Sequence, residues 1–275
     1  MVGRLAQRAG SVAVVTGAAR GIGAALAARL RTEGWRVVGL DLDEPGEQLA
    51  DAWVRGDVCE GSTLEVAIER ARGLGGLGAW INNAALIPDA RPLQTRSRED
   101  IDRILAVNLL APIHATAAAA GELIAAGTSG AIVNLSSIHA ARPSRGWSAY
   151  AAAKAGIEGL TRAAAAEYGP YGVRVNAIAP GQVLTEGYTE QHRAAIDARR
   201  SGLEDRLVRV LHPLGHAATP EEIAAVAAFL LSPAASAVSG VVLPVDGGRQ
   251  ASDPYDALVD ALALEPADAR EGIEV

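Results

Sequence analysis

The chain has 275 residues, 49% of them hydrophobic, and a formal net charge of −7. This length and composition suffice for one α/β domain with a sizeable core. The negative charge argues against a nucleic-acid-binding surface, which would need a basic stripe. Cys59 is the single cysteine, so an internal disulfide is excluded and a reducing compartment, in the first place the cytoplasm, is expected.

Membrane-spanning, secreted and metal-dependent classes are not expected either. The longest apolar stretches, such as the run at 116–120, are interrupted by Gly, Pro or charge before they reach the length of a membrane span. The apolar run at 12–16 is too short for a signal peptide. His212 and His216 have the i, i+4 spacing of a metal-binding pair, but Pro213 and Gly215 disfavour a regular helix there, so we expect no metal site.

Short β-branched runs alternate with longer helical patterns rich in Ala and Leu. This alternation is typical of repeated βαβ units and predicts an α/β fold with a doubly wound parallel sheet of about seven strands and helices on both faces. We expect strands at 11–16, 36–40, 53–57, 79–82, 131–135, 174–178 and 241–245. We expect helices at 21–33, 63–72, 98–126, 149–168 and 220–231.

A single domain is expected over residues 1–250, followed by an acidic C-terminal extension, 251–275. Within the domain, the segment at about 185–214 is helical in composition but has no strand beside it, so we expect it to cover one end of the sheet. The extension carries seven acidic residues and one arginine. Asp253-Pro254 favours the start of a short amphipathic helix with Tyr255 and Leu258 on one face, and a frayed tail is the alternative.

The first predicted strand runs directly into a glycine motif, 16–23, and then into a helix. Such glycines let the backbone turn tightly and approach a pyrophosphate, while the helix N-terminus offers free N–H groups to the phosphates. The context of strand, turn and helix favours a dinucleotide site over a structural turn. The residues we expect to line it are Gly17, Arg20, Gly21, Ile22 and Gly23.

Acidic residues at two strand ends bear on which dinucleotide binds. Asp41 ends the second strand, where a carboxylate would accept hydrogen bonds from the adenosine ribose and repel a 2′-phosphate, so NAD(H) is preferred. Arg20 could pair with that phosphate, which leaves NADP(H) open, and a solvated strand-end charge is the alternative for Asp41. Asp57-Val58 closes the third strand, and Asp57 could hold the adenine amino group; a helix N-cap role for Asp57 is the alternative.

Tyr150 and Lys154 lie at i and i+4 in a helical pattern, so both side chains point from one helix face. A free tyrosine has a pKa of about 10, and a nearby cation favours the phenolate and brings the hydroxyl closer to acid/base use at neutral pH. The spacing alone also occurs in half-exposed helix pairs. Its context is stronger, because Ser136-Ser137 ends the preceding strand at the carboxyl edge, where ligands bind in such sheets.

From about residue 11 to 248 the sequence resembles the short-chain dehydrogenase/reductase family, which has a Rossmann-type fold. The resemblance rests on the glycine motif and on an ordered set of further matches: Asn82-Asn83-Ala84, Asn108, Ser137, Tyr150 with Lys154, Pro180-Gly181 with Thr185, and Val245-Asp246-Gly247-Gly248. Two departures, Ala85 and Ala140 where the family often has Gly, concern packing. The short stretch from Asp41 to Asp57 leaves little room for a helix.

The resemblance implies a hydride transfer between NAD(H) and a secondary alcohol or ketone. Tyr150 would be the general acid/base, Lys154 would lower its pKa and hold the nicotinamide ribose, and Ser137 would bind the substrate oxygen. Asn108 would fix a water that links Lys154 to bulk solvent. The cofactor would also contact the residues after the fourth and sixth strands, namely Asn83, Ala84, Pro180, Gly181, Val183 and Thr185.

Substrate residues are expected on the loop after Ser137 and on the 185–214 segment. His139 resembles a position where hydroxybutyrate and sugar dehydrogenases of the family carry a histidine, so a hydroxy acid or polyol is the hypothesis; a solvated polar loop is the alternative. Trp147, Tyr150 and Gln191 would line the same pocket. The resemblance also implies a homotetramer or homodimer, formed through the helices after Asn108 and after Tyr150.

Two other functions compete with this hypothesis. An NADP(H)-dependent carbonyl or 3-oxoacyl reductase would differ chiefly at Asp41. A non-catalytic dinucleotide-binding regulator would keep the glycine motif, but it would have no reason to keep Asn108, Ser137, Tyr150 and Lys154 together.

Overall fold

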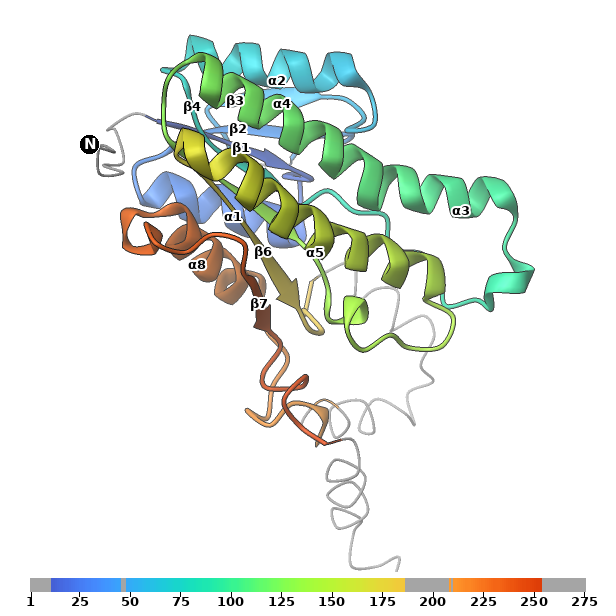
Figure 1. The fold of residues 1–275 in the computed structure, drawn as a ribbon. Coiled ribbons are helices and arrows are strands. Elements are labelled where there is room, and N and C mark those ends of the chain that lie inside the picture. Colours follow the sequence, from blue (N-terminus) through green and yellow to red (C-terminus); the bar gives the residue numbers. More distant parts are fainter. Residues whose placement is uncertain (1–10, 46–47, 186–207, 209, 254–275) are drawn as a thin grey trace, which may run out of the picture.

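The computed structural model describes residues 11–45, 48–185, 208 and 210–253. Seven strands form one parallel sheet in the order β3-β2-β1-β4-β5-β6-β7, which confirms the predicted fold class (Figure 1). The order reverses between β1 and β4, and ligands bind at such a reversal in doubly wound sheets. The strands are β1 (Val12–Thr16), β2 (Arg36–Asp41), β3 (Ala52–Arg55), β4 (Leu77–Asn82), β5 (Gly130–Leu135), β6 (Val173–Pro180) and β7 (Val242–Val245).

Helices cover both faces of this sheet. One face carries α1 (Gly21–Thr32) and α8 (Pro220–Leu231), which pack against each other (Figure 1). The other face carries α2 (Gly61–Gly73), α4 (Ala111–Ala125) and α5 (Ser148–Tyr168). A further helix, α3 (Arg98–Leu105), extends beyond the sheet as a continuation of α4 (Figure 1).

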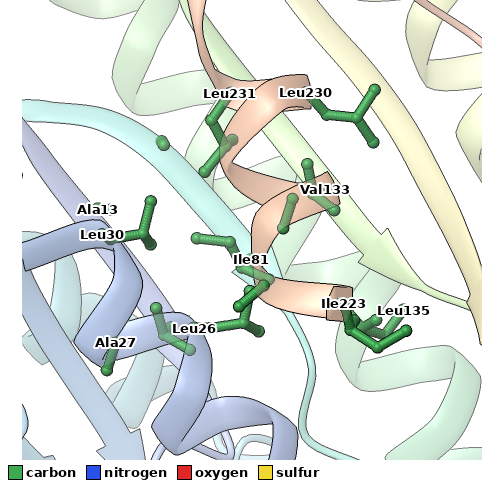
Figure 2. Packing of buried hydrophobic residues seen from close by; sticks show 14 of the residues in the cluster. Ala13, Leu26, Ala27, Leu30, Ile81, Val133, Leu135, Ile223, Leu230 and Leu231 are labelled. Atoms are coloured by element: carbon green, nitrogen blue, oxygen red, sulfur yellow. The ribbon is translucent and has the colours of Figure 1, made fainter. Parts of the chain in front are cut away.

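The central strands are buried on both faces because alternate residues point into two separate hydrophobic layers. Leu26 and Leu30 of α1 belong to one hydrophobic cluster with Ile223 and Leu230 of α8 and with the strand residue Ile81; Figure 2 shows Leu26 and Leu30 on the side of α1 that faces the sheet and α8. The opposite layer packs the sheet against α2, α4 and α5 through residues such as Val14, Leu64, Trp80, Ala119 and Ile132. These two layers hold the carboxyl ends of the strands in fixed register, so the side chains that follow them have fixed positions.

The predicted helix at 98–126 is one continuous rod with an internal change of winding. A π-turn at Ala106–Leu110 separates α3 from α4, and Ala111 N bonds to Ala106 O instead of a carbonyl four residues back. Pro112 follows directly and lacks an N–H group, which regular α-helical winding would need. The wider turn admits the proline without a break in the rod.

The rod also corrects the expectation that no apolar stretch reaches the length of a membrane span. The helical stretch Arg98–Ala125 is 28 residues long, and its most apolar window has a mean hydropathy of 1.5. By length and composition alone it could cross a membrane. Half of its most apolar window is buried inside the protein. The α4 part packs on β4 and α2, as a core helix of the fold does.

Several predicted boundaries shift by one to three residues. The third strand is Ala52–Arg55, so Asp57 and Val58 follow it and do not end it. The second helix starts at Gly61, two residues earlier than predicted. The structure describes no helix between Asp41 and Ala52, in agreement with the short spacing. The tail beyond Asp253 and most of the 185–214 segment, with Gln191, lie outside the described residues.

Candidate functional site

The glycine motif forms a tight loop between β1 and α1. Gly17 and Gly21 have φ values of +66° and +56°, a conformation that favours glycine. A Cβ atom on Gly23 would lie 1.8 Å from Gly17 O, so no other residue fits there. The first turn of α1 has neither a side-chain cap nor an acidic residue. Its N–H groups are therefore available to an anion such as a pyrophosphate.

Thr16, which sequence reasoning did not select, connects this loop to the end of β4. Its hydroxyl accepts hydrogen bonds from Asn83 N and Ala84 N, both at 3.0 Å, and donates one to Ile81 O. The Asn83 amide in turn donates to Thr16 O and Gly17 O at 2.9 and 3.0 Å. The position of Thr16, a hydroxyl residue between a buried strand and a glycine turn, was the available signal.

Asp41 lies beside the glycine loop, as expected from the chain order. Its carboxylate accepts a hydrogen bond from Ala19 N at 2.9 Å. Arg20, in contrast, points to solvent and pairs with Asp43 at 3.9 Å, with 82% of its side chain exposed. The acid is thus fixed against the loop, whereas the guanidinium is held only by a weak surface pair.

Asp57 does not cap α2, because that helix has Glu60 at its N-cap position. Its carboxylate accepts from Cys59 N at 2.9 Å and pairs with Arg103 of α3 at 3.0 Å. Partial burial raises the pKa of Asp57, but these two hydrogen bonds outweigh it and hold the pKa below its usual range. The N-cap alternative is therefore wrong, and Arg103 is a partner that the sequence did not reveal.

Ser137, Tyr150 and Lys154 come together above the carboxyl end of β5. Tyr150 and Lys154 are only 6% and 3% exposed. Lys154 Nζ donates to Leu135 O at 2.7 Å and lies 5.6 Å from the centre of the Tyr150 ring. The sequence thus correctly placed the tyrosine and the lysine on one helix face.

Burial dominates the ionisation of both groups. It raises the pKa of Tyr150 to about 12, although a hydrogen bond with Ser137 opposes the rise. Burial also lowers the pKa of Lys154 to about 8. The expected decrease in the tyrosine pKa is therefore not found in the protein alone. The reason is that desolvation of the phenolate outweighs the hydrogen bond that favours it.

Asn108 is fully buried within the π-turn. Its amide nitrogen donates to Leu86 O at 2.9 Å and to Ile104 O at 3.0 Å. Its Oδ1 is buried and has no hydrogen-bond partner in the described part of the chain. The Asn108 side chain therefore satisfies the Ile104 carbonyl at the point where the helix winding changes. Its own Oδ1 stays available as an acceptor.

Three rings, those of His139, Trp147 and Tyr150, are in mutual contact. The His139 and Trp147 rings stack at 5.0 Å with an interplanar angle of 14°. Both meet the Tyr150 ring edge to face, at 6.1 and 5.6 Å between centroids. The structure thus brings the expected substrate residues His139 and Trp147 to the tyrosine.

The segment after β6 runs from the sheet to the glycine loop. Gly181 N donates to Val245 O, and a Cβ atom on Gly181 would lie 2.9 Å from Asp246 Cα. Val183 pairs with Ala218 in an isolated parallel bridge. The Thr185 methyl would lie 3.2 Å from a Cβ atom on Gly21. Thr185 therefore contacts the glycine loop, and the segment that leads to it starts at Pro180, the last residue of β6.

No group of three or more potential metal ligands occurs among the described residues. His212 is buried, with Nδ1 2.8 Å from Val208 O, whereas His216 Nδ1 lies 3.1 Å from Ala217 O. The two histidines thus have separate backbone partners.

Residues 17–250 match the protein family described as enoyl-(acyl carrier protein) reductase. Cis-4-hydroxycyclohexanecarboxylate dehydrogenase of Sinomonas cyclohexanicum is 40% identical over 253 residues, which cover 87% of this chain and 96% of that protein. The 3beta-hydroxysteroid dehydrogenase 1 of Eggerthella lenta is 37% identical over 251 residues, with coverages of 87% and 93%.

Solved structures show the same architecture. Ligand-free aldohexose dehydrogenase of Thermoplasma acidophilum has a TM-score of 0.82 and 31% identity, covering 89% of this chain and 95% of that one. A putative 2-deoxy-d-gluconate 3-dehydrogenase from Agrobacterium tumefaciens with bound NADP has a TM-score of 0.78 and 35% identity, covering 89% and 98%. Carveol dehydrogenase from Mycobacterium avium in complex with NAD has a TM-score of 0.80 and 28% identity, covering 89% and 99%.

Proposed function

This chain belongs to the short-chain dehydrogenase/reductase family, and we propose that it transfers a hydride between NAD(H) and a secondary alcohol or ketone. It is an oxidoreductase that uses a nicotinamide dinucleotide. The observation that carries the finer proposal is the hydrogen-bonded pair of Ser137 and buried Tyr150, with Lys154 beside them, at the same sheet edge as the uncapped glycine loop.

The site fits a dinucleotide on grounds of its own geometry. Gly17 and Gly23 leave room for a close backbone approach, and the N–H groups that begin α1 would hold the pyrophosphate. Asn83 and Ala84 would line the middle of the crevice, and Pro180, Gly181, Val183 and Thr185 would hold the nicotinamide end. When bound there, the nicotinamide would supply or accept the hydride.

The protein residues handle the proton and the substrate oxygen. In ketone reduction, Tyr150 Oη would donate its proton to the substrate oxygen, and Ser137 Oγ would donate a hydrogen bond to the same atom. The charge on Lys154 would favour the phenolate that forms, because an opposite charge stabilises the ionised state. The free Oδ1 of Asn108 would accept a hydrogen bond from a water on the route between Lys154 and solvent.

NAD(H) is the proposed cofactor because of Asp41. The carboxylate is oriented against the glycine loop by Ala19 N, where it would bind ribose hydroxyls and repel a 2′-phosphate. An NADP(H)-dependent carbonyl or 3-oxoacyl reductase is the second candidate, because Arg20 is 82% exposed and makes only a long surface pair with Asp43, which a 2′-phosphate could replace. The relatives include proteins bound to NADP and to NAD.

A hydroxy acid, polyol or alicyclic alcohol is the proposed substrate class. The support is the pair of stacked rings, His139 and Trp147, in contact with Tyr150, together with the relatives that are named as dehydrogenases of a hydroxycyclohexanecarboxylate and of a hydroxysteroid. We also propose a homotetramer or homodimer built through α4 and α5, whose outward faces carry many small residues.

Separate titrations with NADH and NADPH, read by fluorescence and by heat stability, test the cofactor assignment. Wild-type protein is expected to bind NADH more tightly than NADPH. Asp41→Asn removes the charge that would repel the 2′-phosphate, so the ratio of the NADPH to the NADH dissociation constant is expected to fall about tenfold. Asp102→Asn removes the same charge at an exposed position of α3 and is the matched control. Preference of the wild type for NADPH would overturn the assignment and favour the second candidate.

The role of Tyr150 as general acid/base is tested by removal of its hydroxyl. Secondary alcohols are screened with NAD+ in wild type and in Tyr150→Phe, which keeps the ring but loses the hydroxyl. Turnover is expected to fall between about a hundredfold and ten-thousandfold, the usual contribution of a general acid/base, while NADH binding is kept. Unchanged turnover would exclude Tyr150 as the acid/base.

A further inference from the structure

We propose that Arg96 is a positioning residue for Tyr150 and Trp147. Its buried guanidinium fixes the loop between β4 and α3, and that loop in turn holds the backbone at which α5 begins. The inference rests on the proposed alcohol–ketone chemistry, and it concerns the placement of the acid/base group and not the binding of the dinucleotide.

The Arg96 side chain is only 2% exposed, although it carries a full positive charge. Charged side chains are almost never fully buried unless they are paired and hydrogen-bonded. Nη1 lies 2.6 Å from Asp100 Oδ2 and 3.4 Å from Asp89 Oδ1, and Nη2 donates to Asp89 O. Asp100 belongs to the first turn of α3, whereas Asp89 lies in the preceding loop. Arg96 therefore ties the middle of that loop to the start of the helix.

The loop has two separate anchors. Residues 83–92 form neither a helix nor a strand, so side chains must fix their position. The start of the loop is held by the Thr16 hydroxyl, through the two backbone N–H bonds described above. The part around Asp89 is held by Arg96. The end of the loop that would face the dinucleotide is therefore fixed independently of Arg96.

The part of the loop that Arg96 anchors lies directly against the residue before the N-cap of α5. Arg91 N donates to Gly146 O at 3.2 Å, and a Cβ atom on Gly146 would lie 2.7 Å from Arg91 N. Gly146 has a φ of +86°, so glycine permits both this conformation and the close approach. The next residue, Trp147, is the N-cap of α5 and makes no side-chain cap hydrogen bond. The contact with the loop therefore supports the start of α5.

The start of α5 determines where the acid/base group lies. Tyr150 is the third residue of α5, so a displacement of the first turn moves its hydroxyl. Trp147 is in ring contact with Tyr150 at 5.6 Å, and both belong with Leu86 and Ile104 to one hydrophobic cluster. A misplacement of about 1 Å can lower a catalysed rate about a hundredfold. Loss of the Arg96 guanidinium should therefore reach the reacting groups while the dinucleotide site stays in place.

Fluorine NMR spectra of protein labelled with 5-fluorotryptophan test this path without turnover. The chain has four tryptophans, and the Trp147 resonance is assigned by its absence in Trp147→Phe. Arg96→Met keeps an apolar stem but no charge, and it is expected to shift the Trp147 resonance and to leave the other three in place. Arg96→Lys keeps the charge without the planar fork and should shift it less. Arg98→Met is the matched control, because Arg98 makes the same i, i+4 pair, with Asp102, but is 90% exposed.

Kinetics and binding are then compared for a secondary alcohol that the wild type oxidises. In Arg96→Met, kcat/KM is expected to fall between about tenfold and a hundredfold, whereas the NADH dissociation constant from calorimetry should change less than about twofold. Arg98→Met should match the wild type in both. Asp100→Asn weakens the same tie from α3, at a side chain that is 33% exposed, and should also shift the Trp147 resonance.

The outcomes separate this inference from the proposed function. A Trp147 resonance that stays in place in Asp100→Asn, or in folded Arg96→Met, would overturn the inference, as would equal shifts of all four resonances. A loss of NADH affinity as large as the loss of kcat/KM would also overturn it, because the loop would then lack separate anchors. Absence of wild-type turnover with every alcohol and both cofactors would overturn the proposed function, and the fluorine spectra would still decide the role of Arg96.

Discussion

The ammonium of Lys154 donates its hydrogen bond to Leu135 O, at 2.7 Å, while it lies 5.6 Å from the centre of the Tyr150 ring. The last carbonyl of β5 therefore fixes the cation beside the tyrosine. Both groups are buried, so each is held toward its neutral form, with the tyrosine pKa raised to about 12 and the lysine pKa lowered to about 8. The lysine thus titrates closest to physiological pH.

The rate of ketone reduction is expected to decline as pH rises through about 8. Tyr150 remains protonated across this range, whereas Lys154 is charged below its pKa of about 8 and neutral above it. Loss of the cation removes the stabilisation of the phenolate that forms as the proton leaves. The measurement is kcat/KM for a ketone from pH 6 to 10. A rate that is flat up to pH 9.5 would contradict the depressed lysine pKa.

Gly23→Ala is expected to abolish dinucleotide binding. Its Cβ atom would lie 1.8 Å from Gly17 O, a backbone atom that cannot move without reshaping the loop. Gly61→Ala is the matched control, because nothing lies within 4 Å of its Cβ position at the start of α2. Calorimetric titration with NADH compares the two variants. Normal binding by Gly23→Ala would mean that the loop does not approach the pyrophosphate as proposed.

Arg174→Met is expected to lower the free energy of unfolding by about 1–3 kcal/mol, the cost of leaving buried polar groups without a partner. The Arg174 guanidinium is buried, and it donates to Leu230 O, Ser232 O and Val238 O around the end of α8. Methionine fills similar volume but leaves these carbonyls without that donor. Urea unfolding measures the change, and a loss below about 0.5 kcal/mol would show that water replaces the guanidinium.

Ala163→Glu is expected to dissociate the proposed oligomer. Ala152, Ala155, Gly159 and Ala163 are exposed along one face of α5, where small residues permit close helix packing. A glutamate in such an interface would bring an unpaired charge against a partner helix. Sedimentation velocity compares it with Ala28→Glu, the same change on an exposed position of α1. Equal sedimentation of both variants and wild type would place the interface elsewhere.

The sequence was sufficient for the sheet and for the helix face of Tyr150 and Lys154, since both follow from local periodicity and from the right-handed βαβ connection. It did not predict the π-turn around Asn108, because the hydrophobic pattern continues through it unchanged. The Asp57–Arg103 pair was also missed, since its members are 46 residues apart and meet only through tertiary packing. The direction of the Tyr150 pKa shift could not be predicted either, because it depends on burial of the side chain, which the spacing of residues does not show.

The bonds among Thr16, Asn83 and Gly17 extend the contact between β1 and β4 beyond their last ladder pair. Beyond that pair, hydrogen bonds of side chains replace backbone pairing between β1 and β4. This is the place where the strand order of the sheet reverses. The floor of the crevice is thus rigid before any ligand arrives. A dinucleotide that enters it has little main chain to order, so more of its contact energy remains as affinity.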